Sequence, residues 1–532
     1  MRTFDYIVIG GGTAGCVLAN RLSANPAHTV LLLEAGQSDN YVWIHIPVGY
    51  LFCIDNPRTD WRYRTEAEPG LHGRSLLYPR GKVMGGSSSI NGMIYMRGQQ
   101  ADYDQWAAQG CIGWDWASVL PYFLRSEDHH GGPTPLHGAG HELRVEKQRL
   151  SWAILDAFQA AAAQAGIPPV DDFNTGDNFG CGYFEVNQRR GVRWNARKAF
   201  IEPIKHRRNL HILTSALVDT LDIDHHMVCR GVNTLIAGER HSFMANKEVI
   251  LCAGAVNSPA ILERSGIGRA EVLHAANVPC KLDTRGVGEN LQDHLQLRLA
   301  FKVQGVTTLN EQVQTWWGKA RMGLQYALLR RGPLTMSPSQ LGCFARTASS
   351  PQRTNVEYHV QPLSLDKFGE PLHNFPAFTA SVCDLQPSSR GHIHICDANP
   401  QSAPRIVPNY LSTTRDQHIA AEAIELTRRI VAQPALAHLQ PQEFLPGPQA
   451  QSTEQLIEAA GRIGTTIFHP VSTCRMGPDS EAEAVLDPQL RVRGVHQLRV
   501  ADASAMPTIT SGNTNAPTVM IAEKAADFII KG

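Results

Sequence analysis

The sequence predicts an α/β fold in which a parallel-sheet domain is interleaved with a second domain that combines an antiparallel sheet with helices. The chain opens with a buried strand, a glycine-rich turn, a helix and a second buried strand, which is the order of a βαβ unit. Between residues 210 and 252, short strand candidates follow one another. Strand candidates after residue 350 lie where no cofactor-like glycine loop occurs, so we assign them to the second sheet.

The individual elements follow from apolar runs and their boundaries. The opening unit comprises a strand over 4–9, a helix over 15–23 and a strand over 29–33. An amphipathic helix is expected over 519–530, with Pro517 near its first turn, where a missing N–H does no harm. The second sheet would contain the strands over 356–361 and 392–395. A meander that returns to the first sheet is expected from 210–213, 217–223, 228–236, 242–244 and 248–251.

The composition is that of an ordinary globular protein, with 43% hydrophobic and 18% charged residues among 532. Because 49 basic residues balance 49 acidic ones, we expect no nucleic acid partner. The same balance argues against a function that depends on anionic membranes, but peripheral membrane association stays open. No apolar run reaches the length of about 18 residues that a spanning helix needs, and the first is too short for a secretory signal, so we expect a cytoplasmic protein. The eleven scattered cysteines indicate reduced thiols.

The first glycine loop follows the opening strand and has the spacing G-x-G-x-x-G. Gly10 permits the tight turn, Gly12 lets a pyrophosphate approach the backbone, and Gly15 lets the helix pack against the strand. Glu34 ends the second strand, where a carboxylate can accept hydrogen bonds from both ribose hydroxyls. Since this carboxylate would repel a 2′-phosphate, the loop predicts a dinucleotide site that does not take an NADP-type adenosine.

Two further glycine clusters lie over 80–91 and 254–268. The first contains more glycine than a turn needs, as expected of a backbone that lies against a ligand. The second follows a strand and opens another helix. Three such loops in one chain predict an extended ligand, longer than a single nucleotide.

These motifs resemble those of the glucose–methanol–choline (GMC) flavoprotein oxidoreductases. Segment 81–98 resembles the first family signature, with Met84 where Leu, Ile, Val or Trp is usual, and 254–268 is similar to the second at every defined position. The resemblance looks closest to the bacterial choline- and alcohol-dehydrogenase branch. It runs from residue 5 to about 530, because further similar segments lie over 287–294, 469–477 and 498–504.

The resemblance implies FAD and the GMC oxidoreductase fold, with a Rossmann-like FAD-binding domain. In some members a histidine immediately before the position of Asn91 is bonded to the flavin; here this residue is Ile90, so noncovalent FAD is expected. The FAD-binding domain would comprise 1–150, 207–300 and 465–532, and the substrate-binding domain 151–206 and 301–464. The implied cofactor-binding residues are Gly10, Gly12, Thr13, Ala14, Gly15, Glu34, Ala35, Arg80, Gly81, Gly85, Gly86, Ser88, Asn91, Gly92, Val218, Ala253, Asp502, Ala503, Asn513, Thr514 and Thr518.

The resemblance also implies a catalytic pair. Flavin-dependent alcohol oxidation needs a base for the hydroxyl proton, and histidine suits this task because its ordinary pKa is about 6.5. His469 resembles the family's catalytic histidine, and Asn513 best occupies the position of its partner, with Asn515 as the competing assignment. An asparagine can donate a hydrogen bond to the substrate oxygen but cannot take its proton, which leaves His469 as the sole base.

The expected reaction is oxidation of a primary alcohol to the aldehyde with hydride transfer to FAD. A choline-type dehydrogenase, an alcohol oxidase that makes hydrogen peroxide and a non-redox lyase of the same family remain alternatives. We favour a quinone or dye over oxygen as the electron acceptor. No motif specifies the oligomeric state.

Substrate preference is predicted from segments expected to face the pocket. Leu51, Phe52 and 375–378 favour a neutral aromatic or medium-length aliphatic alcohol. Choline would need a carboxylate or an aromatic cage, for which Glu357 and Asp366 are candidates.

Other aromatic and polar clusters favour structural roles. Trp61 and the pair Trp316 and Trp317 could line an aromatic pocket, but core packing is the favoured interpretation. No metal site is expected, because His392 and His394 share a strand face without an apparent third ligand, and the adjacent pairs His129–His130 and His225–His226 should diverge.

Overall fold

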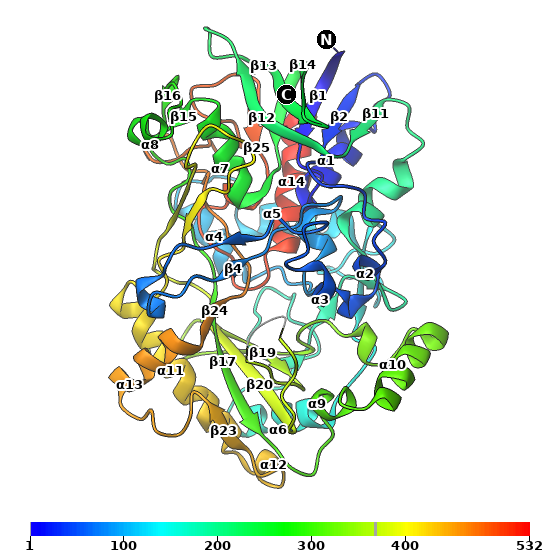
Figure 1. The fold of residues 1–532 in the computed structure, drawn as a ribbon, viewed down its shortest axis with the longest axis vertical. Coiled ribbons are helices and arrows are strands. Elements are labelled where there is room, and N and C mark those ends of the chain that lie inside the picture. The colour runs from blue at the N-terminus through cyan, green and yellow to red at the C-terminus, as the bar shows by residue number, and fades with distance from the viewer. Residues whose placement is uncertain (1, 367–369, 532) are drawn as a thin grey trace.

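The chain forms two regions, each built around one large sheet, at opposite ends of the long axis (Figure 1). The computed structural model describes residues 2–366 and 370–531. Within these residues, each large sheet has seven strands, and no helix is long and apolar enough to cross a membrane. All eleven cysteines are unpaired, and Cys280 and Cys396 are the exposed ones. The predicted α/β fold class is confirmed.

The first sheet has the order β11-β2-β1-β14-β13-β12, with β25 beside β14. β1, β2, β11, β14 and β25 run parallel, whereas β12 and β13 form an antiparallel meander that ends in β14. The predicted strands over 242–244 and 248–251 are one strand, with a register irregularity beside Phe4 and Tyr6. The bounds are β1 Arg2–Ile9, β2 Val30–Leu33, β11 Leu210–Leu213, β12 Ala216–Ile223, β13 Cys229–Ile236, β14 Glu239–Leu251 and β25 Leu498–Val500.

Helices α1 (Thr13–Leu22) and α14 (Asn515–Lys531) pack against each other beside the first sheet (Figure 1). An ion pair joins them, with Arg21 Nη2 2.6 Å from Glu523 Oε1. Thr13 Oγ1 donates to Asn515 Oδ1 at 2.9 Å, so the two helix N-termini lie at the same edge of the sheet. Thr13 and Thr514 both line the cavity described below.

The second sheet is antiparallel, with the order β23-β17-β20-β19-β18-β7 and with β24 beside β17. Successive side chains along each strand point to opposite faces of this sheet. Leu297, Leu299, Tyr358 and Val360 lie on the face that packs into the second core, against α6, α11 and α13. The bounds are β7 Gly180–Tyr183, β17 Leu295–Lys302, β18 Leu341–Ala345, β19 Val356–Gln361, β20 Ala377–Asp384, β23 Gln442–Leu445 and β24 Gly464–Thr466.

One predicted strand forms, but it was assigned to the wrong sheet. The segment over 392–395 forms β21 (His392–His394), which pairs with β22 (Arg405–Val407) in a separate two-stranded sheet. An alternating pattern indicates a half-buried strand but not its partner. The domain division stays a prediction, and β17 begins before the predicted boundary at residue 300.

The remaining elements connect or cover the two sheets. The other strands are β3 Tyr63–Arg64, β4 Leu77–Tyr78, β5 Glu127–His129, β6 Leu143–Lys147, β8 Glu185–Val186, β9 Gln188–Arg189, β10 Val192–Arg193, β15 Ile267–Gly268 and β16 Leu282–Asp283. The other α-helices are α2 Val42–His45, α3 Tyr50–Cys53, α4 Gln100–Ala108, α5 Trp116–Ser126, α6 Ala153–Gln164, α7 Gly254–Arg264, α8 Ala270–Ala275, α9 Leu309–Gln312, α10 Trp316–Leu329, α11 Thr414–Val431, α12 Pro434–Ala437 and α13 Thr453–Ile463.

Candidate active site

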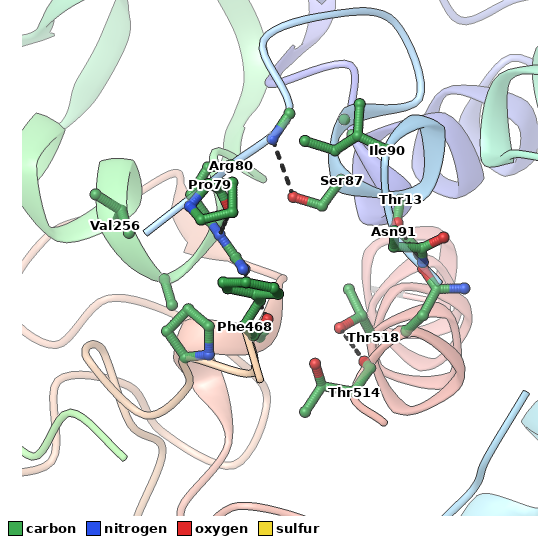
Figure 2. A pocket seen from close by; sticks show the side chains of 18 of the residues that line it. Thr13, Pro79, Arg80, Ser87, Ile90, Asn91, Val256, Phe468, Thr514 and Thr518 are labelled. Carbon is green, nitrogen blue, oxygen red and sulfur yellow. Dashed lines mark hydrogen bonds between the residues drawn. The ribbon is translucent and has the colours of Figure 1, made fainter. Parts of the chain in front are cut away.

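A large cavity is lined both by the glycine loops of the first region and by side chains of the second sheet. Figure 2 shows Arg80 and Phe468 on one side of it and Asn91, Thr514 and Thr518 on the other. Most of the predicted cofactor-binding residues line this cavity. They are Gly10, Gly12, Thr13, Ala14, Glu34, Ala35, Arg80, Gly81, Gly86, Asn91, Gly92, Val218, Ala253, Asp502, Ala503, Asn513, Thr514 and Thr518.

Three predicted residues, Gly15, Gly85 and Ser88, do not line the cavity but shape the loops around it. A Cβ atom on Gly15 would overlap the carbonyl oxygen of Gly10, so only glycine lets α1 approach β1 here. Gly85 has a φ of +89° and donates its N–H to Gly11 at 2.7 Å, which joins the first two loops. Ser88 Oγ donates to the Gly85 carbonyl at 2.5 Å.

The first loop presents backbone N–H groups to the cavity. Gly12 is the N-cap of α1, and no side chain caps this helix. A Cβ atom on Gly12 would meet nothing closer than Gly86 Cα at 3.8 Å, so the two loops approach each other without filling the space in front of them. Free N–H groups at a helix N-terminus suit the two phosphates of a dinucleotide.

The Glu34 carboxylate is buried at the end of β2 and lines the cavity. Burial raises its pKa to about 7, although backbone N–H groups of Gly36 and Gly11 donate to Oε1 and Oε2 at 2.7 and 2.8 Å. Each oxygen retains a lone pair for a further donor. Two ribose hydroxyls would supply these donors and stabilise the ionised form.

The third loop is fixed by Asp502, which follows β25. Its Oδ2 accepts hydrogen bonds from Gly254 N at 2.8 Å and Ser258 Oγ at 2.6 Å. The start of α7 is thereby held at the cavity, beside Ala253. Together the three loops offer a carboxylate for a ribose, N–H groups for phosphates and a glycine-lined surface for a flat ring, which fits FAD.

His469 and Asn513 meet at the cavity, although 44 residues separate them in the sequence. Asn513 Nδ2 lies 3.0 Å from His469 Nε2. Asn515, the competing assignment, also lines the cavity but accepts a hydrogen bond from Thr13 Oγ1 at 2.9 Å. Of the two asparagines, the geometry therefore favours Asn513 as the partner of the histidine.

His294 determines which nitrogen of His469 carries the proton. Its Nε2 lies 3.1 Å from the carbonyl oxygen of Leu385, which can only accept, so this nitrogen bears the hydrogen. In the neutral ring, His294 Nδ1 is then an acceptor, and it lies 3.1 Å from His469 Nδ1. His469 must donate from Nδ1, which leaves its Nε2 unprotonated and directed at Asn513.

The surroundings also keep the His469 ring neutral and in place. Burial, with nearby His294, His359 and Arg80, holds the pKa of His469 well below its ordinary value. The backbone N–H of His469 donates to Asp293 Oδ1 at 2.7 Å, and Thr466 Oγ1 donates to Asp293 Oδ2 at 2.7 Å. A neutral, fixed imidazole with an unprotonated Nε2 can act as a base near pH 7.

Side chains of the second region complete the cavity, and sequence reasoning missed them. The signal was present, since on β17 and β19 these polar residues alternate with core residues. Alternation shows that a strand has a polar face but not what that face covers. The missed lining residues of the second region include Gln296, Arg298, Ser339, His359 and Gln361, and Tyr50 on α3 is a further missed residue.

The segments predicted to face the substrate lie elsewhere. Leu51 and Phe52 are 40% and 49% exposed on α3, and neither lines the cavity. Phe378 packs in the second core, because apolar strand residues face the helices while polar ones face the cavity. Glu357 is fully buried outside the cavity lining, and Asp366 is exposed and paired with His373.

Core packing, the favoured interpretation for the three tryptophans, is wrong for two of them. Trp316 and Trp317 are 64% and 70% exposed on α10, so they belong neither to a core nor to the cavity. Trp61 does line the cavity and stacks on Tyr63, with ring centroids 5.6 Å apart.

The expected divergence is wrong for both adjacent histidine pairs: the ring centroids of His225 and His226 lie 3.8 Å apart, and those of His129 and His130 lie 4.4 Å apart. Because β5 ends at His129, the two rings do not follow one regular element, and both Nε2 atoms lie 2.8 Å from Glu185 Oε1. This group has the spacing of a metal site. Burial raises the pKa of Glu185, but hydrogen bonds from both histidines bring it down to about 2. These bonds already satisfy the ring nitrogens that a metal would need.

His392 and His394 do not form a shared metal site in the described chain. His394 instead bridges two carboxylates, with Nδ1 2.6 Å from Glu263 and Nε2 3.2 Å from Glu289. Burial lowers its pKa, but the two carboxylates outweigh burial and raise it to about 9. The ring is therefore a structural ion-pair partner.

Comparison with known proteins agrees with this architecture. Residues 4–296 and 387–522 match two family models described as GMC oxidoreductase. The chain is 38% identical to the oxygen-dependent choline dehydrogenase of Vibrio vulnificus, over 99% of this chain and 94% of that protein. It is 37% identical to the alcohol dehydrogenase [acceptor] of Pseudomonas putida, over 99% and 96% of the two chains.

Solved structures share the whole fold. The pyridoxine 4-oxidase from Mesorbium loti superposes with a TM-score of 0.89 at 32% identity, covering 98% of both chains. The formate oxidase of Aspergillus oryzae RIB40, for which FAD modification is described, superposes with a TM-score of 0.92 at 26% identity. The match covers 100% of this chain and 98% of that one.

Proposed function

The chain belongs to the GMC oxidoreductase family, and from that premise we propose that it oxidises a primary alcohol to the aldehyde with FAD. The observation that carries this proposal is the unprotonated Nε2 of His469, which faces Asn513 in the cavity that the glycine loops share. FAD, when bound, accepts the hydride that leaves the alcohol carbon.

The residues of the chain supply the proton chemistry. His469 Nε2 takes the hydroxyl proton as the carbon–hydrogen bond breaks, and the second amide hydrogen of Asn513 Nδ2 is available to the alcohol oxygen. His294 acts as a positioning residue, because it holds the His469 proton on Nδ1. Burial also favours the neutral form of His469.

Anaerobic mixing of the holoenzyme with a panel of primary alcohols tests this function. We expect the absorbance of oxidised flavin to disappear with at least one alcohol. A lyase of the same fold would leave the flavin oxidised while product forms, and that result would contradict the proposal.

We further propose that FAD is held noncovalently. Ile90 is buried, lines the cavity beside Asn91 and has no nucleophilic atom (Figure 2). Acid precipitation should therefore release the flavin into the supernatant. Flavin that stays with the precipitate would show a covalent bond at another residue.

Helix α10 supports a quinone as electron acceptor, reached by peripheral attachment to the cytoplasmic face of a membrane. Five of its large apolar side chains are more than 60% exposed, whereas Met322 and Tyr326 are buried. Lys319, Arg321, Arg330 and Arg331 lie in or beside the helix. Tryptophans and cations around an apolar surface are typical of helices that lie in a membrane interface. The exposed apolar residues are Trp316, Trp317, Leu324, Leu328 and Leu329.

Vesicle flotation and acceptor assays test this attachment. We expect binding to phosphatidylglycerol-containing vesicles, loss of binding in a Trp316→Ser/Trp317→Ser/Leu324→Ser variant, and no loss in Ile112→Ser, which alters an isolated exposed apolar residue. Turnover should be faster with a vesicle-dissolved quinone than with oxygen. Vesicle binding by the triple variant at the wild-type level would refute the attachment. One hydrogen peroxide formed per alcohol oxidised, with no quinone reduced, would refute the quinone as acceptor.

A further inference from the structure

Arg298 brings a positive charge to the end of the cavity formed by the second sheet. On β17 it alternates with Leu297 and Leu299, which pack in the second core, and its own side chain lines the cavity. Backbone pairing places Arg298 opposite Ser381 on β20, and Ser381 opposite His359 on β19. Arg298 and His359 are thus in one row across the sheet, about 10 Å apart at two strand spacings.

Within the described chain, this guanidinium has one hydrogen bond and no carboxylate partner. Its Nη2 donates to Gln361 Oε1 at 3.5 Å, the limit of a hydrogen bond, and Gln361 Nε2 donates to Ser339 Oγ at 3.1 Å. A guanidinium carries five N–H donors in a planar fork, so most of them remain for another acceptor. Burial lowers the pKa of Arg298 to about 10, which still leaves it charged at pH 7.

Other arginines in the protein have closer acceptors, including fully buried Arg193, which has no carboxylate partner in the described chain but donates to Asn91 Oδ1 at 2.9 Å. Arg97 lies 2.8 Å from Glu127, and Arg499 lies 2.9 Å from Glu248. Arg80, which also lines the cavity, donates to the Phe468 carbonyl at 2.7 Å. Arg298 is half-buried in the cavity wall without such partners, and an anionic ligand would supply the missing charge.

Carboxylates in the described cavity lining occur only with the cofactor loops, as Glu34 and Asp502. Glu357, one of the two candidate partners for an ammonium group, is fully buried outside the cavity lining, and its Oε1 lies 3.1 Å from His359 Nε2. The substrate end is therefore cationic or neutral. A quaternary ammonium group placed there would meet a like charge rather than an anion.

We propose that the substrate is a primary alcohol with an anionic group, of which a carboxylate is the best match, bound by Arg298 with Gln361 and Ser339 beside it. A carboxylate matches the guanidinium fork with two parallel hydrogen bonds. This assignment rests on the proposed alcohol oxidation and deepens it by naming the substrate class. It replaces the neutral alcohol expected from the apolar segments, which face elsewhere.

Three para-substituted benzyl alcohols of different charge test the proposal. They are 4-(hydroxymethyl)benzoate, 4-methylbenzyl alcohol and 4-(trimethylammonio)benzyl alcohol. We expect the holoenzyme to favour the carboxylate over the neutral alcohol by roughly 10- to 100-fold in kcat/KM, and to turn over the ammonium compound least. A wild-type preference for the neutral or the ammonium compound would overturn the proposal.

Variants assign the preference to Arg298. In Arg298→Met the carboxylate-to-neutral ratio should fall to about 1, Arg298→Lys should retain part of it, and Arg64→Met, an exposed arginine outside the cavity lining, should keep the wild-type ratio. An unchanged ratio in Arg298→Met would contradict the assignment. If Arg298→Met does not fold, the ratio in Arg298→Lys and the wild-type preference among the three alcohols still test the assignment.

Binding without turnover separates this inference from the proposed function. Non-oxidisable 4-methylbenzoate should perturb the flavin absorbance of the wild-type holoenzyme and bind roughly 10- to 100-fold more weakly to Arg298→Met. If no alcohol reduces the flavin but 4-methylbenzoate binds in this way, only the proposed oxidation fails. If neutral alcohols are oxidised and 4-methylbenzoate does not bind, only the anionic substrate fails.

Discussion

The two ends of the cavity offer a ligand different kinds of groups. The cofactor end presents backbone groups of glycine loops, among them Gly12 and Gly86, with the carboxylates of Glu34 and Asp502. The substrate end uses side chains from separate strands, such as Arg298 and His359. Recognition by backbone requires glycine at fixed spacings and therefore leaves a motif. Recognition by side chains on a sheet leaves only the alternation that any half-buried strand shows.

The two ends also differ in charge. Glu34 and Asp502 lie with the glycine loops, whereas the described lining from the second sheet contains Arg298 and no carboxylate. Substitutions should therefore separate into those that weaken FAD and those that slow or redirect alcohol oxidation. The following substitutions test that separation, beginning with the largest expected effect.

His469→Ala should lower the rate of flavin reduction by roughly 10²- to 10⁴-fold, the range for loss of general base catalysis. FAD occupancy should remain at the wild-type level, because the loops that contact the cofactor are unchanged. Stopped-flow reduction and the flavin-to-protein absorbance ratio measure the two quantities. An unchanged reduction rate would refute His469 as the base.

His294→Leu removes the acceptor for His469 Nδ1 and lets the imidazole proton move to Nε2. A buried donor without a partner costs about 1–3 kcal/mol, so kcat should fall roughly 5- to 150-fold. The loss should appear in kcat rather than in KM, and His294→Asn, which can accept a hydrogen bond, should recover part of it. Equal loss in both variants would indicate a general disturbance of packing.

Glu34→Gln should weaken FAD binding by roughly 10- to 100-fold, because hydrogen bonds to a charged acceptor contribute about 1.5–3 kcal/mol each. Since burial holds the pKa of Glu34 at about 7, wild-type affinity should increase as the pH rises through that value and the carboxylate ionises. Glu34→Gln should lose this pH dependence. Fluorescence titration of the apoprotein measures both, and kcat of the FAD-saturated variant should stay near wild type.

Asn513→Ala should give the smallest loss, roughly 2- to 12-fold in kcat/KM, because one hydrogen bond of about 0.5–1.5 kcal/mol disappears while the base remains. Asn515→Ala is the matched control, since it alters a neighbouring cavity residue that contacts Thr13 rather than His469. A larger loss in Asn515→Ala than in Asn513→Ala would make Asn515 the partner of His469.

Sequence patterns located the cofactor end in detail because its geometry is local. The turn at Gly10 has a φ of +101°, and a Cβ atom there would overlap the Cys252 carbonyl oxygen, so the residue type itself reports the conformation. The order of strands and helix around it follows from short-range apolar patterning. The composition and the family motifs likewise sufficed to predict the fold class and FAD.

Only the tertiary structure decided which neighbours these segments acquire. The tautomer of His469 depends on the Leu385 carbonyl, reached through His294, and no sequence spacing encodes that chain of contacts. The assignment of Leu51 and Phe52 to the pocket failed because apolar composition does not distinguish a surface or core position from a cavity wall. Arg298 remained unnoticed because a charged residue on a strand is ordinary until the sheet places it in a cavity without a counter-ion, and burial and charge pairing arise only when distant strands assemble.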